Sequence, residues 1–566
     1  MKIFDNIILD GYESKELKRY DDEPSTLPPM VAFENLPNLS PKGVLIANQY
    51  IDGRLMQIYT PDDSHALIIS ATGGGKTTSF VIPQVISFAR QATKKSMIIS
   101  DPKGEIYKHT AKYLEAQGYR VYLLNYRDPD HSEYWNPLTP IYRQYQIVLN
   151  IEKEVEDVCE NGTFKKKFRG KIYDIDDDLK YDLAIAKENE LDKVGNMIDE
   201  IASMMISVES SKDKVWEYGA IELLKAFLWA MLEDSNDKTR LEHFDKITED
   251  TYSLRTIFRI FASFNPLNDY NPDNKYFSKR DKSSPAYIYS RSTMDCARGT
   301  RSSYTSTFLA KLIVFKNAII QTITSCNSFE LSELLGGKVA VFIDYQDEIK
   351  THYQLISLFV QSAYKFLIEE ANKNPNGRLD TPFYFILDEF GNFPPITDFD
   401  TAITAARGRG IFFCCILQSY AQLDNVYGQN TAGIIRDNLN VKIFLGNNNP
   451  HTLELFQKEC GDFTRISPLS ALNGSGAQIN DFRLETIPVV TRSALSSFKA
   501  GECVVTQLNV PYVLWSKLER CFLCDEFSSI PKANDREYKS KVNPYEKRYI
   551  YRIPNPNNSD DDDDLF

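Results

Sequence analysis

The stretch H-A-L-I-I-S-A-T-G-G-G-K-T-T, at residues 65–78, decides the fold. Its first six residues predict a buried strand, and residues 77–91, with Pro83 near the start, predict a helix. The glycine-rich segment between them therefore has the context of a phosphate-binding P-loop. Three consecutive glycines let backbone N–H groups turn toward phosphate oxygens, and the helix N-terminus adds the positive end of its dipole. A glycine-rich turn without a ligand is the alternative interpretation.

The P-loop pattern predicts a run of nucleotide-binding residues, namely Thr72, Gly73, Gly74, Gly75, Lys76, Thr77 and Thr78. We expect Lys76 to bridge the β- and γ-phosphates of ATP during catalysis, and Thr77 to bind Mg²⁺. The pattern normally begins with glycine, but this chain has Ser70 there. A serine would weaken nucleotide binding if the backbone needed a positive φ at that point. We expect Ser70 to be tolerated, because the later glycines approach the phosphates most closely.

Strand patterns recur along the chain at intervals filled by helical sequence. They lie at residues 65–70, 96–100, 120–125, 338–345, 383–387, 411–417 and 441–445, which gives at least seven candidate strands. Strand, helix and strand in this order imply parallel pairing through right-handed crossovers. The sequence therefore predicts an α/β fold with a mostly parallel sheet and ligand sites at the carboxyl ends of the strands.

A long interruption separates the third of these strands from the fourth. Between residues 143 and 327 the sequence is charged and helix-periodic, as at residues 215–232, and has few strand signals. We therefore predict an arm with short strands at 1–60 and a nucleotide-binding domain in two parts, 61–142 and 328–540. An inserted all-α domain occupies 143–327, and a disordered acidic tail occupies 541–566.

The strand at residues 383–387 ends in two acidic residues, Asp388 and Glu389. A carboxylate that leaves the sheet beside a P-loop can organise Mg²⁺, and a neighbouring carboxylate can polarise the attacking water. We assign the first role to Asp388 and the second, catalytic role to Glu389. An acid pair after a strand otherwise serves as a helix cap or a solvated turn, which is the alternative interpretation.

The strand at residues 411–417 has polar residues at both ends. Gln418 follows it, and we expect this side chain to sense the γ-phosphate or to orient water. A-A-R-G-R-G precedes it, so Arg407 or Arg409 can complete a neighbouring subunit's site as an arginine finger. A surface salt bridge is the alternative for either arginine.

Together, five motifs resemble those of the type IV secretion coupling proteins, the conjugative DNA-transfer ATPases of TraG/TraD type. They are S-A-T-G-G-G-K-T followed by F-V-I-P, D-P-K-G-E (101–105), D-P-D-H-S-E-Y-W-N-P-L (128–138), L-D-E-F-G-N-F-P-P-I (387–396) and L-Q-S-Y-A-Q-L (417–423). The resemblance spans residues 47–518 and implies a RecA-like motor domain interrupted by an all-α domain and assembled as a homo-hexameric ring. It matches Lys76 and Thr77 to the nucleotide site, Asp388 and Glu389 to the acidic motif, Arg407 to the inter-subunit arginine and Gln418 to the sensor glutamine.

The resemblance also implies a function. Such rings recruit a relaxase bound to single-stranded DNA and pass it to secretion channel proteins while hydrolysing ATP with Mg²⁺. Family members commonly begin with two transmembrane helices, whereas this sequence has no apolar run of ~18 residues. We therefore expect a cytoplasmic protein that a membrane-anchoring partner holds at the inner face of the cell membrane. The alternatives are a DNA translocase of FtsK or HerA type and a nucleotide-binding adaptor without turnover.

Composition restricts the remaining possibilities. The net charge of −13 excludes a uniformly basic surface, so contacts with nucleic acid require local clusters of Lys and Arg. The cluster K-K-K-F-R-G-K at residues 165–171 predicts a solvated, charge-balanced loop, with a phosphate contact as the alternative. Cys521 and Cys524 have metal-ligand spacing but lack a second pair, which favours buried thiols. The final D-D-D-D-D-L-F is either a solubilising tail or a docking peptide for a basic groove.

Overall fold

The structure is a computed structural model that describes residues 30–32, 43–51, 54–60, 62–160, 163–206, 214–242, 244–264, 276–346, 348–468, 482–508, 510 and 513–552. These residues form two compact units. The sheet unit contains the described residues up to Arg127 together with Glu330–Tyr538. The helical unit contains Asp128–Phe329 and the described residues from Lys539 onward.

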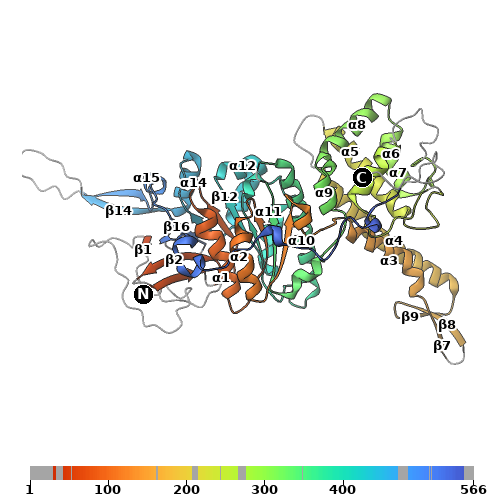
Figure 1. The fold of residues 1–566 in the computed structure, drawn as a ribbon, viewed down its shortest axis with the longest axis horizontal. Coiled ribbons are helices and arrows are strands. Elements are labelled where there is room, and N and C mark those ends of the chain that lie inside the picture. Colours follow the sequence, from red (N-terminus) through yellow and green to blue (C-terminus); the bar gives the residue numbers. More distant parts are fainter. Residues whose placement is uncertain are drawn as a thin grey trace, which may run out of the picture. The chain divides into compact units, whose positions relative to one another are not determined.

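A ten-stranded sheet forms the centre of the sheet unit (Figure 1). Its strands lie in the order β1 (Met30–Ala32), β17 (Val513–Lys517), β16 (Glu502–Gln507), β13 (Val441–Phe444), β4 (Ala66–Ile69), β12 (Ile411–Leu417), β11 (Phe383–Leu387), β5 (Ser96–Asp101), β10 (Val339–Asp344) and β6 (Arg120–Asn125). The seven strands from β13 to β6 all pair in parallel, which confirms the predicted sheet. β16 runs antiparallel to both of its neighbours, β13 and β17.

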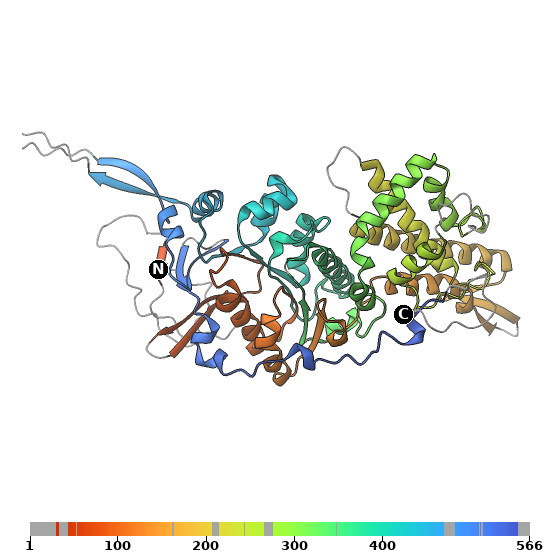
Figure 2. The ribbon, with the colours of Figure 1, turned by 45° about the horizontal axis from the view of Figure 1, so that its top comes forward.

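The central strands are apolar because helices cover both faces of the sheet. Every residue of β11 and of β12 is buried. On one face lie α1 (Ile82–Arg90) and α2 (Glu105–Ala116), whose aromatic rings contact rings on β11 and β10. On the other face lie α10 (Lys350–Lys373) and α11 (Phe399–Ala406), each of which places a ring against Phe413 of β12. Figure 2 shows these helices on the two sides of the sheet.

The helix predicted at residues 77–91 begins as a wider π-helical segment, η1 (Lys76–Val81), and continues as α1. The remaining helices of the sheet unit are α12 (Tyr420–Tyr427), α13 (Gln429–Asn438), α14 (Pro450–Cys460), α15 (Arg492–Ser496) and α16 (Asp525–Ser528). Two antiparallel hairpins pair β2 (Leu45–Ile51) with β3 (Arg54–Tyr59) and β14 (Asp462–Pro468) with β15 (Phe482–Pro488). β2 and β3 fall within the arm for which short strands were predicted.

The helical unit is built mainly from helices, as predicted. They are α3 (Thr139–Asn150), α4 (Asp176–Met205), α5 (Lys214–Glu233), α6 (Leu254–Phe264), α7 (Pro285–Met294), α8 (Arg298–Lys311) and α9 (Ala318–Ile323). α5 is the helix expected at residues 215–232. The unit begins at Asp128, ahead of the predicted boundary at residue 143, because Tyr134 and Trp135 are buried in it and the Trp135 N–H donates to the Ile323 carbonyl.

One part of the insertion is not helical, which corrects the expectation of an all-α domain. β7 (Glu156–Glu160), β8 (Thr163–Phe168) and β9 (Lys171–Tyr173) form a small antiparallel sheet. The loop predicted at residues 165–171 is therefore wrong, although its charge balance is confirmed. Lys166 and Lys167 form ion pairs with the acidic residues directly opposite them on β7, and such cross-strand pairs stabilise a sheet.

The disordered tail predicted at residues 541–566 is wrong for its first part. Residues 547–549 form a 3₁₀ turn, and Tyr549 packs with Tyr134 and Cys326 in a buried cluster. The Tyr551 hydroxyl donates to the Asp245 carbonyl at 3.1 Å. The sequence analysis missed this ordered segment because charged residues surround the two tyrosines that anchor it. The five terminal aspartates, Leu565 and Phe566 lie outside the described residues.

Within the described ranges, no helix combines the length and the apolar character needed to cross a membrane.

A buried ion cluster connects α5 with the segment that precedes α7. The Arg280 guanidinium, 1% exposed, lies 3.0 Å from the Glu233 carboxylate and 2.8 Å from the Asp234 carboxylate. The Tyr276 hydroxyl donates to Asp234 at 3.0 Å. Because water does not reach these charges, each depends on its partners for stabilisation.

Replacing Arg280 with Met should lower the free energy of unfolding of the helical unit by about 3–5 kcal/mol, because it leaves two buried carboxylates without a counter-charge. Chemical denaturation followed by circular dichroism measures the change. The control is Arg291→Met, which breaks an exposed pair with Asp295 and should lower the free energy of unfolding far less, because water already screens that pair. Equal losses in the two variants would contradict this account of the cluster.

Candidate functional site

Lys76, the first residue of η1, lies against the two acidic residues that follow β11. Its ammonium nitrogen is 3.5 Å from Asp388 Oδ1 and forms an ion pair with Glu389. β12 separates β4 from β11 in the sheet, and the three strands run parallel. The loops that leave β4 and β11 therefore meet at the same edge of the sheet.

Thr77 and Asp388 place two oxygen atoms side by side. The Thr77 hydroxyl donates to Asp388 Oδ2 at 3.3 Å, and the Ser100 hydroxyl of β5 holds the Asp388 carbonyl at 2.9 Å. Burial raises the pKa of Asp388 above its usual range, while the nearby Lys76 opposes this rise. Hydroxyl and carboxylate oxygens are the ligands that Mg²⁺ prefers, so this pair fits a magnesium ion.

The backbone of the glycine-rich loop has the conformation that only glycine adopts easily. Gly73 and Gly75 have φ values of +81° and +88°. A Cβ on Gly74 would lie 2.4 Å from Ser70 Oγ and 3.1 Å from the Ala71 carbonyl oxygen, so a side chain there would force these neighbours to move. Ser70 itself is absent from the described residues with positive φ, and its N–H donates to the Leu417 carbonyl of β12 at 3.1 Å. The loop therefore accepts Ser70 without backbone strain, as expected.

Glu389 adopts a backbone conformation that is uncommon for a residue with a side chain. Its φ of +55° and ψ of +33° lie in the left-handed region, at a cost of order 1–3 kcal/mol. The Gln418 side-chain amide N–H donates to Glu389 Oε2 at 2.9 Å, and the Thr72 hydroxyl donates to Gln418 Oε1 at 3.4 Å. The structure thus brings Thr72, Lys76, Glu389 and Gln418 together. Thr78 follows on η1, where its hydroxyl donates to the Gly75 carbonyl at 3.3 Å.

Arg407 does not reach this site within its own chain. It lies in the turn before β12, at the end of the sheet where the parallel strands begin, whereas the loop after β4 lies at the end where they finish. The Arg407 side chain is exposed. Burial and the nearby Arg407 charge lower the pKa of His65, just before β4, to about 3. Arg409 donates to the Asn372 side chain and to the Ala405 carbonyl, both at 3.2 Å. Neither arginine forms an ion pair with a described residue.

Residues 34–472 match the protein family described as type IV secretory system conjugative DNA transfer. This chain belongs to that family. The match covers most of the chain and includes every site residue described above. It favours a coupling protein over a translocase of FtsK or HerA type.

Two relatives show how far the likeness extends. A probable conjugal transfer protein TraG of Sinorhizobium fredii is 22% identical over 486 residues, which cover 81% of this chain and 63% of that protein. Protein VirD4 of Agrobacterium fabrum is 20% identical over 412 residues, which cover 71% of this chain and 50% of that protein. The chain therefore spans between half and two thirds of the length of these relatives.

Solved structures of the bacterial conjugative coupling protein TrwB share the fold. An unbound form has a TM-score of 0.52 at 14% identity and covers 84% of this chain and 88% of that one. A TrwB complex with ADP and Mg²⁺ has a TM-score of 0.50 at 14% identity and covers 81% of this chain and 85% of that one. Both confirm the α/β fold of this family member.

Two buried acids that the sequence analysis did not select complete the site. Asp101 ends β5 and Asp344 ends β10, and both side chains are buried. Desolvation raises the pKa of each to about 7. The D-P-K-G-E motif begins with Asp101, and four of its residues line a cleft together with Lys76, Thr77, Asp388 and Glu389. The motif and its place after a strand were signals that could have identified Asp101.

Arg127 holds the D-P-K-G-E turn in place. Its guanidinium donates to the carbonyls of Pro102 and Tyr345, and its Nε lies 2.8 Å from Asp344 Oδ1. These contacts join the ends of three strands, β5, β10 and β6. No sequence pattern marks Arg127, because its partners lie far away along the chain.

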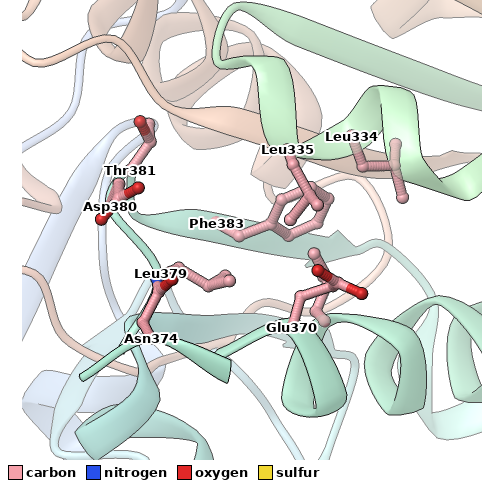
Figure 3. A pocket seen from close by; sticks show the side chains of 9 residues that line it. Leu334, Leu335, Glu370, Asn374, Leu379, Asp380, Thr381 and Phe383 are labelled. Atoms are coloured by element: carbon pink, nitrogen blue, oxygen red, sulfur yellow. The ribbon is translucent and has the colours of Figure 1, made fainter. Parts of the chain in front are cut away.

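Two other features of the described residues carry no part of this site. Cys521 and Cys524 are free thiols, and both are buried, as the sequence analysis expected. Figure 3 shows a separate pocket where β11 begins, at the end of the strand away from Asp388. Leucine side chains and Phe383 form much of its lining.

Replacing Asp101 with Asn should stabilise the nucleotide-free protein strongly at pH 8 and by a smaller amount at pH 5. The Asp101 carboxyl loses its proton near its usual pKa of about 4 in the unfolded state, but only near pH 7 in the folded state. As the pH rises between these two values, unfolding therefore releases a proton, and this carboxyl destabilises the fold increasingly. Asp344 and Asp388 face Asp101 and raise its pKa further, whereas the N–H groups of Tyr107 and Ile106 lower it. Thermal unfolding at the two pH values checks this, and equal melting temperatures at pH 8 would contradict it.

Proposed function

We propose that this protein is an ATP-hydrolysing coupling protein, which links a relaxase bound to single-stranded DNA to a type IV secretion channel. The observation that carries the proposal is the meeting of Lys76 and Thr77 with Asp388 and Glu389 at one edge of the sheet. A glycine-rich loop facing two carboxylates is the arrangement of an NTP-hydrolysing site. Family membership and the nucleotide complexes of TrwB support the choice of ATP and Mg²⁺.

Each residue has a role that follows from its position. The N–H groups of Gly73, Gly74 and Gly75 bind phosphate oxygens, and Lys76 exchanges its carboxylate partners for the β- and γ-phosphates. Thr77 and Asp388 would hold Mg²⁺, and the ion would supply charge neutralisation on the phosphates. Glu389, once released by Lys76, accepts a proton from the attacking water. Gln418 lies within hydrogen-bonding distance of Glu389 and orients that water.

The position of Arg407 supports assembly as a ring. Its place at the far edge of the sheet prevents it from reaching the phosphates bound by its own chain, but leaves it exposed to a neighbour. In a homo-hexamer, a head-to-tail interface would bring this edge of one subunit to the nucleotide site of the next. Arg407 would then neutralise charge in the transition state.

The partners follow from the family. Relaxase, single-stranded DNA and channel proteins are the expected cargo and contacts, and an anchoring partner would hold the ring at the inner face of the cell membrane. With a net charge of −13, contact with DNA depends on local basic groups that a ring brings together in its lumen.

Replacing Lys76 with Ala should abolish DNA-stimulated ATP hydrolysis and weaken nucleotide binding, because the phosphates lose their main positive partner.

Glu389→Gln should keep nucleotide binding and lower the hydrolysis rate by about 100-fold or more, because a neutral amide cannot accept the proton. The control is Lys112→Ala, which removes an exposed lysine of α2. If wild type and Lys76→Ala are equally inactive while relaxase still binds, the chain is an adaptor without turnover.

Replacing Arg407 with Ala should lower hydrolysis as strongly as Lys76→Ala does, yet a mixture of the two variants should regain activity. In an equal mixture, about a quarter of the interfaces pair an intact nucleotide site with an intact Arg407. Steady-state rates of the two variants, alone and mixed, measure this. Arg409→Ala serves as the matched control with near-normal activity. A mixture no faster than its separate components would show that Arg407 does not act between subunits.

A further inference from the structure

The segment that follows β17 packs against the start of η1. Residues 519–524 read E-R-C-F-L-C, and within them η8 (Cys521–Leu523) contacts η1. Cys521 and Cys524 are buried in the core beneath the segment, with exposed fractions of 5% and 0%. The two buried cysteines therefore hold in place the backbone of the segment that carries Arg520 and Phe522.

Arg520 lies beside the glycine-rich loop. A Cβ built on Gly75 would be 3.4 Å from Arg520 Nε, and it would also approach Ser79 Oγ at 3.2 Å and Thr78 Oγ1 at 3.6 Å. Arg520 therefore flanks the side of η1 from which Thr78 and Ser79 project. Lys76 and Thr77 face the other way, toward Glu389 and Asp388.

The charge of Arg520 has no counter-ion among the described residues. Its Nε is buried without a hydrogen-bond partner, and its guanidinium carbon lies 5.9 Å from the centre of the Phe522 ring. An arginine without an acidic partner beside a phosphate-binding loop has the geometry and charge to bind phosphate oxygens.

Two large apolar side chains close to Arg520 in sequence are exposed to solvent. Phe522 is 55% exposed and Leu523 is 60% exposed. They are adjacent in sequence and flanked by the two buried cysteines, so the exposure is confined to this pair. An apolar surface beside a phosphate site suits the flat face of a nucleobase, and a cation over an aromatic ring reinforces such stacking.

We propose that Arg520 and Phe522 form the nucleoside side of the nucleotide site: Arg520 binds the α-phosphate of a nucleoside triphosphate, and Phe522 packs on its base. The direction follows from the P-loop. Lys76 reaches the β- and γ-phosphates on the Asp388 side, so the α-phosphate and the nucleoside leave toward Thr78, where Arg520 lies. This inference rests on the proposed function, which supplies the triphosphate ligand.

Binding measurements test the proposal without relying on hydrolysis. Isothermal titration calorimetry gives the Kd of a non-hydrolysable ATP analogue with Mg²⁺, and of inorganic tripolyphosphate with Mg²⁺, for the full chain. The variants are Arg520→Gln, Arg520→Lys and Phe522→Ala. The control is Arg536→Gln, an exposed arginine of the same unit. Melting temperatures without ligand verify that each variant is folded, which is expected because both target side chains are partly exposed.

Arg520→Gln should weaken binding of both ligands by about tenfold or more, because a charge-assisted contact to phosphate is lost. Arg520→Lys should recover part of this loss by restoring the charge. Phe522→Ala should raise the Kd of the ATP analogue by about tenfold and keep the Kd of tripolyphosphate within about twofold of the wild-type value, because only the nucleotide carries a base.

A Kd for Arg520→Gln within about twofold of wild type would overturn the role of Arg520. Equal effects of Phe522→Ala on the two ligands would overturn the role of Phe522. If wild type binds neither ligand, or if Lys76→Ala binds both as well as wild type does, the proposed function fails as well. If Lys76→Ala loses binding while both new variants retain it, only the present inference fails.

Discussion

The structure depends on the parallel register of β4, β12 and β11. Leu417 of β12 lies opposite Ile69 of β4, and Cys415 of β12 lies opposite Leu387 of β11, so the three strands end at the same edge of the sheet. This register places Lys76 beside Asp388 although more than three hundred residues separate them in the chain. A shift of one residue would turn the strand side chains to the opposite face and would separate the loop from its carboxylates.

Much of the sheet could be predicted because its central strands are covered on both faces. β11 and β12 are continuous apolar runs, and their predicted and observed bounds coincide. β16 and β17 were missed because E-C-V-V-T-Q and V-L-W-S-K mix polar with apolar residues, as strands near a sheet edge do. The hairpin at β8 was missed because consecutive lysines resemble a solvated loop, and their partners on β7 become visible only when the strands pair.

The site divides in the same way. Asp388 and Gln418 could be predicted because each directly follows an apolar strand, and Glu389 is the next residue after Asp388. Lys76 and Thr77 belong to a short contiguous pattern. The positions of Arg127 and Arg520 follow from tertiary contacts between segments that lie far apart in sequence, whereas Asp344 ends an apolar strand and carries the same signal as Asp388. Arg407 was placed by resemblance, and the sheet's topology now explains why its own chain cannot use it: the turn that carries it precedes β12, whereas Gln418 follows the same strand.

The ordered tyrosines of the last described segment have a practical consequence. Tyr549 and Tyr551 complete the interior of the helical unit, so a chain shortened ahead of them would expose apolar surface and invite aggregation. The activity lost through aggregation would then be mistaken for the effect of removing a docking signal. Deletions that probe the terminal aspartates should therefore keep the chain up to Arg552, so that both tyrosines are retained.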